Sequence, residues 1–321
     1  MPASIQPLFR FLQALELELH TKPQRGRPLR YSNSAMLLFF IAMALKRIHA
    51  FKTMADYAKQ HYARFGFSHP PSRKTLRRRF LALPTLIQLF MPALAQQAHG
   101  LDERFGFRIA FVDKSLFRAN GGLWHKRHMK TGEVPHRSID TDASWGKSAY
   151  HGWRFGYGLH VVCNGLRFPV AARATTASAK EYHVLLELLS ALAQRCLLVV
   201  ADAGYRSIRV LEKVWKQLKI FVLLPAPFKS TSPAKTWYNE LLGRTATRWI
   251  YARRKPSIEP VFSVVKQLFV LQGNTPLPYR GLSKVSAYLL LVVFSVQVLM
   301  VYNSIHQHPL QATKPFRLAL D

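Results

Sequence analysis

Acidic residues are scarce in this chain. Its 321 residues include 16 Asp and Glu against 46 Lys and Arg, which gives a formal net charge of +30. Apolar residues make up 49% of the sequence, enough to build a core, so general disorder is excluded. A folded chain with this much positive charge needs a polyanionic partner. Nucleic acid is the first such partner to consider, and an anionic membrane surface is the second.

Cysteine is almost absent as well. Cys163 and Cys196 are too few for a disulfide scaffold, and both lie in apolar, strand-like runs. We therefore expect them to be core residues of a protein in a reducing cytoplasm. No internal repeat with a fixed period is present either, which argues against a solenoid or a propeller.

Signals for export or membrane insertion are weak. The first twenty residues interrupt their apolar pattern with Arg10, Glu16 and Glu18, so no secretory signal is expected. The run at 35–45 is too short to cross a bilayer, and the longer run at 285–302 contains two serines and a glutamine. We expect this second run to be a buried helix; a membrane span is the alternative.

The first hundred residues have a helical pattern. Helices are expected at 34–46 and 53–63, and a third begins after Ser72, which suits an N-cap. In the third helix Leu76, Phe80 and Leu83 form one apolar stripe. Its other faces carry five cations and no acid: Arg73, Lys74, Arg77, Arg78 and Arg79. A solvated face normally mixes both charge signs, so these cations favour contact with a DNA groove or its phosphates.

A short tetrapeptide adds to this picture. Arg25-Gly26-Arg27-Pro28 matches the core of minor-groove AT-hooks, in which arginines enter a narrow A·T groove. A match of this length is weak evidence when taken alone.

After residue 100 the pattern changes to alternating strands and helices. Strands are expected at 107–113, 153–163, 166–172, 196–201 and 220–224, and helices at 182–194 and 207–218, with a last helix capped by Ser257. A polar, basic loop at 114–152 separates the first two strands, and Asn164-Gly165 marks a hairpin turn. The expected fold class is therefore α/β.

Two aspartates stand out among the few acids. Asp113 and Asp202 each follow an apolar strand, at the end where open α/β sheets bind ligands. Glu259 lies on a later helix with Lys266 on the same face. Three converging carboxylates suit Mg²⁺ or Mn²⁺ and a two-metal site for phosphoryl transfer. A turn-capping role is the alternative for a single strand-end aspartate.

Two other constellations are less informative. The pair His125 and His128 has metal-ligand spacing but is surrounded by lysine and arginine, so a basic DNA-contacting loop is the preferred interpretation. Trp124 and Trp145 lie in the same loop. They are either stacking platforms for an unpaired base or core anchors.

The sequence resembles the DDE transposases of bacterial insertion sequences, which have an RNase H-like catalytic domain. The matching stretches are FVDKS around Asp113, the strand pair at 153–170, VVADAGYRS at 199–207 and IEPVFSVVK at 258–266. RGRPLRYS and PSRKTLRRRF also resemble that group's DNA-binding region. The resemblance covers nearly the whole chain.

The resemblance implies roles for individual residues. Asp113, Asp202 and Glu259 would be the catalytic, metal-binding triad, and Lys266 would lie near the transferred strand. The family often has an arginine four positions before the glutamate, where this chain has Lys255. The adjacent residues Arg253 and Arg254 are substitutes, and Tyr251 is one residue short of the usual spacing against Lys255. For the family's acidic residue after the third strand, Glu181 is the nearest match.

The resemblance also implies an architecture. It predicts a helix-turn-helix-like DNA-binding region at 1–100, an RNase H-like mixed sheet flanked by helices at 101–303, and a tail at 304–321. The implied function is cleavage of terminal inverted repeats and strand transfer into target DNA with two Mg²⁺ or Mn²⁺ ions, by a homodimer at the bacterial nucleoid. A non-catalytic DNA-binding protein, regulatory or decayed, is the alternative function.

Overall fold

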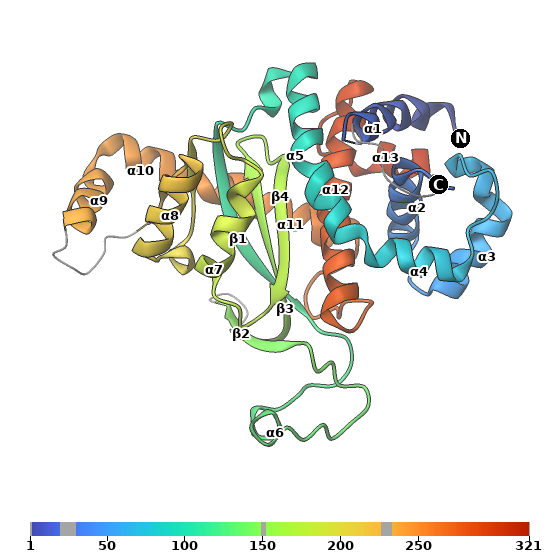
Figure 1. Ribbon diagram of the computed structural model, residues 1–321, viewed down its shortest axis with the longest axis horizontal. Coiled ribbons are helices and arrows are strands. Elements are labelled where there is room, and N and C mark those ends of the chain that lie inside the picture. Colours follow the sequence, from blue (N-terminus) through green and yellow to red (C-terminus); the bar gives the residue numbers. More distant parts are fainter. Residues whose placement is uncertain (1, 20–29, 149–151, 226–232, 321) are drawn as a thin grey trace.

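The computed structural model of the chain describes residues 2–19, 30–148, 152–225 and 233–320 (Figure 1). Helices form one end of the molecule, and a mixed sheet with its own helices forms the other. The N-terminal helices are α1 (Gln6–Leu19), α2 (Asn33–Leu45), α3 (Phe51–His61), α4 (Arg73–Leu81) and α5 (Leu83–Leu101). The predicted helical N-terminal region is therefore confirmed.

Local sequence explains where α2 begins. The Ser32 hydroxyl accepts a hydrogen bond from the amide of Ala35, as expected of an N-cap. The Glu16 carboxylate accepts from the amides of Asn33 and Ser34 and from the Ser34 hydroxyl. Glu16 thus satisfies free N–H groups at the start of a helix that is almost entirely buried.

The basic helix α4 begins as expected, since Ser72 accepts a hydrogen bond from the amide of Thr75. Leu76, Phe80 and Leu83 are all buried, which confirms the predicted stripe, although Leu83 belongs to α5.

The sheet contains six strands: β1 (Ile109–Arg118), β2 (Ser144–Ser148), β3 (Gly152–Asn164), β4 (Pro169–Thr176), β5 (Leu198–Val200) and β6 (Phe221–Leu223). The strand order is β2-β3-β1-β5-β6, and β4 pairs with β3. Strands β1, β3 and β4 are antiparallel neighbours, whereas β5 and β6 continue the sheet in parallel. Flanking helices include α7 (Glu181–Ser190), α8 (Ile208–Leu218) and α11 (Arg254–Leu268). This mixed sheet flanked by helices confirms the predicted fold class.

The expectation that the first strand ends on Asp113 is wrong. Strand β1 continues to Arg118 because β3 pairs with it along its whole length, and Asp113 lies opposite Val161. The expected loop at 114–152 also contains β2 and the short helix α6 (Lys126–Thr131). Polar and basic composition masked these pairings in the sequence.

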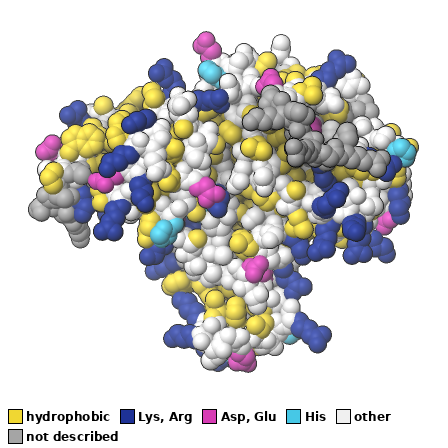
Figure 2. Space-filling view, in the orientation of Figure 1, with side chains coloured by type: hydrophobic (Ala, Val, Ile, Leu, Met, Phe, Trp, Pro, Cys, Tyr) yellow, Lys and Arg dark blue, Asp and Glu magenta, His cyan; other side chains and the backbone are white. Residues whose placement is uncertain are grey.

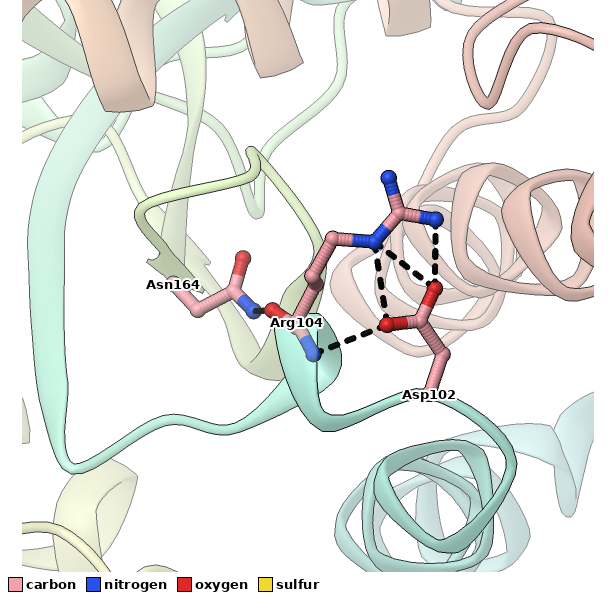
Figure 3. A network of polar contacts seen from close by, with 3 residues as sticks. All are labelled: Asp102, Arg104 and Asn164. Atoms are coloured by element: carbon pink, nitrogen blue, oxygen red, sulfur yellow. Dashed lines mark hydrogen bonds and ion pairs between the residues drawn. The ribbon is translucent and has the colours of Figure 1, made fainter.

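The turn between β3 and β4 is held from outside the hairpin. Asn164 accepts hydrogen bonds from the amides of Leu166 and Phe168 through its side-chain oxygen. Its side-chain nitrogen donates to the carbonyls of Arg104 and Gly106. Figure 3 shows Asn164 next to Arg104, whose guanidinium pairs with Asp102. The predicted hairpin is confirmed, and its turn is fastened to the segment that precedes β1.

The segment between β1 and β2 protrudes from the sheet and carries α6 (Figure 1). The indole of Trp145 donates to the carbonyl of Trp124, and the indole of Trp124 donates to the carbonyl of Glu133. Both side chains are partly buried against the core. Of the two alternatives for these tryptophans, the contacts favour anchoring.

Helix α12 (Leu282–Ile305) joins the two ends of the molecule. It packs against β4, α5, α11 and the N-terminal helices. It is long and apolar enough to cross a membrane, as the bent pair α4–α5 is if taken as one span, but 94% of the most apolar part of α12 is buried inside the protein. This burial agrees with the expected core helix. The expected tail includes α13 (Thr313–Leu320), whose Phe316 is buried. The domain boundaries at 100 and 303 stay predictions.

Candidate active site

Asp113 and Asp202 occupy equivalent positions on neighbouring parallel strands. The last register pair of β1 and β5 joins Phe111 to Val200, and each aspartate follows two residues later. Side chains two positions apart point to the same face of a sheet. The two carboxylates are therefore brought to one face, just past the end of the parallel pairing.

Arg254 lies between these carboxylates. Its Nη1 atom is 2.9 Å from Oδ2 of Asp113, and its Nη2 atom is 3.8 Å from Oδ1 of Asp202. The Arg254 side chain is only 7% exposed, whereas those of Asp113 and Asp202 are 20% and 46% exposed. One buried cation thus lies between two acids and offsets part of their negative charge.

Burial and charge act in opposite directions here. Burial raises the pKa of Asp113, although the Arg254 guanidinium and the backbone amide of Lys114 oppose the rise. Burial alone would lower the pKa of Arg254, but the charges of Asp113, Tyr251 and Asp202 outweigh it and raise the pKa. A positive charge between the two aspartates is therefore strongly favoured.

The donor set accommodates a divalent cation in part. Two carboxylates that converge on a buried positive charge have the oxygen chemistry that Mg²⁺ and Mn²⁺ require. No cluster of three or more His, Cys, Asp or Glu side chains in metal-binding geometry occurs among the described residues.

Glu259 is exposed on α11. Within the described ranges, no hydrogen bond or ion pair joins it to Asp113 or Asp202. The structure brings together two members of the predicted triad and leaves the third apart. The role of Glu259 therefore rests on the motif and stays a prediction.

Helix geometry explains this separation. An α-helix turns by about 100° per residue, so Glu259 is rotated by roughly 140° from Arg254, which is five positions earlier. At the family's four-residue spacing from Arg254 this chain has Ile258, which is completely buried. The extra residue turns the glutamate away from the face that Arg254 occupies.

Helix α11 also begins earlier than expected. It starts at Arg254, so Ser257 is not its N-cap and Pro260 lies inside the helix. Pro260 has no N–H for the carbonyl of Pro256. Arg167 supplies the missing donor, because its Nε atom lies 3.2 Å from that carbonyl oxygen.

The other candidate residues next to Arg254 differ from it in exposure. Arg253 and Lys255 are exposed, and the Arg253 guanidinium stacks 3.7 Å from the ring centroid of Trp249. Tyr251 lies beside Arg254, and burial raises its pKa. Of the two arginines named as substitutes for the family's arginine, only Arg254 pairs with the site aspartates.

Lys266 follows further along α11. Its ammonium lies 5.6 Å from the ring centroid of Phe117 on β1. Burial lowers its pKa, and the charge of Arg154 adds to that effect. Lys266 is therefore partly buried beside the same strand as Asp113.

The basic face of α4 is solvent-exposed at four of its five cations: Arg73, Lys74, Arg77 and Arg78. Arg79 differs, because its guanidinium donates to the side chain of Asn33 and is partly buried. Arg25 and Arg27 lie outside the described residues. Figure 2 shows Lys and Arg spread over the visible face with few acids between them.

The predicted histidine pair forms no metal site among the described side chains. His128 pairs instead with Glu133 through a 2.8 Å contact. The aspartates of the protruding segment also have structural roles: Asp140 and Asp142 accept hydrogen bonds from the amides of Gly281 and Leu282 at the start of α12.

Sequence reasoning gave no role to Lys114. It lies next to Asp113 but points to the opposite face of the sheet, where Glu181 attracts it. The only sequence signals were a lysine inside an apolar strand and an acid at the start of a helix.

Comparison of the sequence with curated proteins finds no match. Among solved structures, a piggyBac transposase synaptic complex with hairpin DNA is similar, with a TM-score of 0.45 and 10% identity over 98% of this chain and 77% of that chain. A Mos1 transposase paired-end complex with the left transposon end has a TM-score of 0.22 and 11% identity, covering 78% of this chain and 82% of that chain.

The sequence itself matches a known family. The family model of the transposase DDE domain matches residues 104–297, which include Asp113, Asp202 and Glu259. The match covers more than half of the chain, so this protein belongs to the DDE-domain transposases.

Proposed function

We propose that the chain is the transposase of a bacterial insertion sequence, which cuts the ends of its element and joins them to target DNA. The observation that carries this proposal is the convergence of Asp113 and Asp202 on one buried cation, just past the end of the parallel pairing between β1 and β5. The family match supports the same reaction class.

Asp113 and Asp202 would hold the metal, and Glu259 is proposed as the third carboxylate on the strength of its motif. When bound, two Mg²⁺ or Mn²⁺ ions would activate the attacking oxygen and stabilise the leaving oxygen. Arg254 supplies the positive charge between the aspartates in their absence.

The proposed chemistry is in-line displacement at phosphorus. In cleavage, the oxygen of water forms the new P–O bond, and the bond to the 3′-oxygen breaks and leaves a 3′-hydroxyl. In joining, the 3′-hydroxyl of the element attacks a phosphodiester of the target DNA. The new P–O bond forms as the 3′-oxygen of the target strand leaves. No covalent bond between protein and DNA is needed.

Basic side chains would position the DNA. Lys266, partly buried beside β1, would neutralise a phosphate near the cleaved bond. Arg253 and Lys255 at the start of the same helix, and Tyr251 just before it, would also contact the DNA. The four exposed cations of α4 would contact the terminal inverted repeats, together with Arg25 and Arg27. A homodimer that pairs two ends, acting on chromosomal DNA in the cytoplasm, completes the proposal.

Mapping of strand breaks tests this function. A supercoiled plasmid carrying the gene with its native flanking DNA is incubated with the protein and Mg²⁺, and breaks that leave a 3′-hydroxyl are located. We expect them at inverted repeats with the wild-type protein and none with Asp202→Asn. The variant should keep salt-sensitive DNA binding.

A non-catalytic DNA-binding protein is the second candidate. The position of Glu259, away from both aspartates on the exposed side of α11, favours it. Tight, salt-sensitive binding without breaks in either Mg²⁺ or Mn²⁺ would establish that alternative.

A further inference from the structure

Behind the two aspartates, on the other face of β1, lies a set of buried polar residues that the proposed chemistry does not use. Lys114 follows Asp113 directly and therefore points to the opposite face. Its ammonium donates to the carbonyls of Ala177 and Ala179, at 3.0 and 2.8 Å. These two carbonyls lie in the segment that leads from β4 into α7.

Glu181 is the first residue of α7 and faces Lys114. Burial raises the pKa of the Glu181 carboxyl to about 7, the charge of Lys114 opposes this rise, and the charges of Asp113 and Asp202 add to it. Glu181 is therefore close enough to both site aspartates to interact with their charges.

Gly158 and Gly204 carry no side chains, and Lys114 and Glu181 occupy the space that this leaves. A Cβ atom at Gly204 would lie 2.0 Å from Oε2 of Glu181 and 2.5 Å from its Cδ. A Cβ atom at Gly158 would lie 2.6 Å from Cε of Lys114. The Glu181 carboxylate thus rests directly against the backbone of Gly204, two residues after Asp202.

The same turn is held at a second point. Helix η4 (Ala203–Tyr205) follows Asp202, and the Tyr205 hydroxyl lies 2.9 Å from Nδ1 of His160. Nε2 of His160 lies 3.1 Å from the Thr175 hydroxyl, which donates to the carbonyl of Thr176. Since Thr175 donates onward, Nε2 carries the proton and Tyr205 donates to Nδ1. Both Tyr205 and His160 are fully buried.

We propose that Glu181 is a positioning residue, which holds the turn after Asp202 through its contact with Gly204 and so sets where the Asp202 carboxylate is presented to metal. This inference rests on the proposed function. Asp202 itself is half exposed, and within the described residues its only ion pair is the 3.8 Å contact with Arg254. Its placement therefore depends on the turn that follows it.

Mn²⁺ binding to the full-length protein without DNA tests the proposal, with free Mn²⁺ measured by electron paramagnetic resonance. Loss of a residue that orients a metal ligand weakens metal binding by about 10- to 100-fold. We expect this loss for Glu181→Ala and for Gly204→Ala, whose methyl group displaces the carboxylate. Glu181→Gln, which keeps the shape and an acceptor oxygen, should stay within about threefold of wild type.

The matched control is Glu187→Ala on the same helix, where Glu187 is exposed and pairs with Arg173; its Mn²⁺ affinity should be unchanged. The double variant Glu181→Ala/Gly204→Ala should be no weaker than Glu181→Ala alone, because both changes act on one contact. Its two methyl groups also refill part of the space, so if Gly204→Ala alone fails to fold, Glu181→Ala and the double variant still give the comparison. Thermal unfolding without metal checks the fold of each variant.

Three results would overturn the proposal: unchanged Mn²⁺ affinity in Glu181→Ala, multiplied losses in the double variant, or Glu181→Gln as weak as Glu181→Ala, which would make Glu181 a metal ligand. Asp202→Asn separates this failure from failure of the proposed function. Equal Mn²⁺ binding by wild type and Asp202→Asn would mean that Asp202 does not hold the metal, and the proposed function itself would fail.

Discussion

At the scale of single residues, Arg254 differs from its two cationic neighbours by helix geometry alone. Helical periodicity turns it inward between Asp113 and Asp202, whereas Arg253 and Lys255 point to solvent. Its Nη1 atom forms the 2.9 Å ion pair with Asp113, and its Nε atom has no hydrogen-bond partner among the described groups. Arg254 is thus held chiefly by charge, which suits a side chain that a metal or a phosphate can draw away.

Arg254→Gln is expected to lower the free energy of unfolding by about 1–3 kcal/mol, because two neighbouring carboxylates lose their shared cation. The partial exposure of both aspartates keeps this value below that of a fully buried pair. Mg²⁺ should raise the melting temperature of the variant more than that of wild type, since the ion restores a positive charge.

Arg253→Gln is the matched control and should change stability by less than about 0.5 kcal/mol. Thermal unfolding with and without Mg²⁺ measures both effects. An equal response of the two variants to Mg²⁺ would contradict this account of Arg254.

His160 predicts a pH dependence. Burial lowers its pKa to about 3, and the charges of Lys114 and Arg173 add to the effect. A histidine with a lowered folded-state pKa contributes stability above its unfolded pKa of about 6.5, and this is lost as the pH falls below that value. The slope reaches at most about 1.4 kcal/mol per pH unit.

Chemical denaturation from pH 7 to pH 5 should therefore show a shallower loss of stability in His160→Gln than in wild type. His183→Gln, at an exposed position on α7, should keep the wild-type slope. Identical slopes in all three proteins would argue against a neutral, buried His160.

At the scale of elements, α4 separates two kinds of arginine. Arg78 is exposed, whereas the Arg79 guanidinium donates a 2.6 Å hydrogen bond to the side-chain oxygen of Asn33. If α4 contacts DNA phosphates, Arg78→Gln should reduce the slope of log affinity against log salt by about 0.9, the value for one phosphate contact.

Arg79→Gln should instead lower stability by about 1–3 kcal/mol and leave that slope unchanged, since it breaks a partly buried hydrogen bond to a charged group. Fluorescence anisotropy with inverted-repeat DNA at several salt concentrations measures the slopes. A larger change of slope in Arg79→Gln than in Arg78→Gln would show that the DNA-contacting face of α4 is assigned incorrectly.

Elements with local signals were predictable from the sequence. An apolar run located α2, a cap and an apolar stripe located α4, and apolar runs located β5 and β6. The continuation of β1 past Asp113 was not predictable, because it depends on long-range pairing with β3 rather than on composition. The start of α11 was also missed, since the Arg167 donor that compensates for Pro260 lies 89 residues earlier than Pro256.

The site was predictable to a similar degree. Their position after apolar runs singled out Asp113 and Asp202, although β1 continues past Asp113. Their convergence follows from the parallel register of β1 and β5. Which face of α11 is buried was not predictable from the motif. The motif fixes only the spacing of its charged residues, and one extra residue rotates the helix by about 100°. Lys114 and Glu181 were missed as a unit because the glycines that make room for them lie far apart in sequence.

At the scale of the whole molecule, α12 connects the helical region to the sheet. Asp140 and Asp142 cap its first turn from the protruding segment, and Asp140 also accepts a hydrogen bond from the buried Tyr157 hydroxyl. The protruding segment, the sheet and α12 thus share one polar junction.

Asp140→Ala is expected to destabilise the protein by about 2–4 kcal/mol, because it removes a helix cap and leaves a buried hydroxyl without its acceptor. Asp56→Ala, which removes only an exposed pair with Lys59, should destabilise the protein far less than Asp140→Ala. Urea unfolding measures both losses. Equal losses in Asp140→Ala and Asp56→Ala would mean that the polar junction does not couple the protruding segment, the sheet and α12.

We propose that Asp113 and Asp202 form the metal-dependent cleavage centre. Cleavage of the native flanking DNA by Asp202→Cys in Mg²⁺ and in Mn²⁺ tests this, because a thiolate ligand accepts Mn²⁺ far better than the harder Mg²⁺. We expect breaks at the inverted repeats in Mn²⁺ and none in Mg²⁺. Cleavage by Asp202→Cys in Mg²⁺ at the wild-type rate would contradict it.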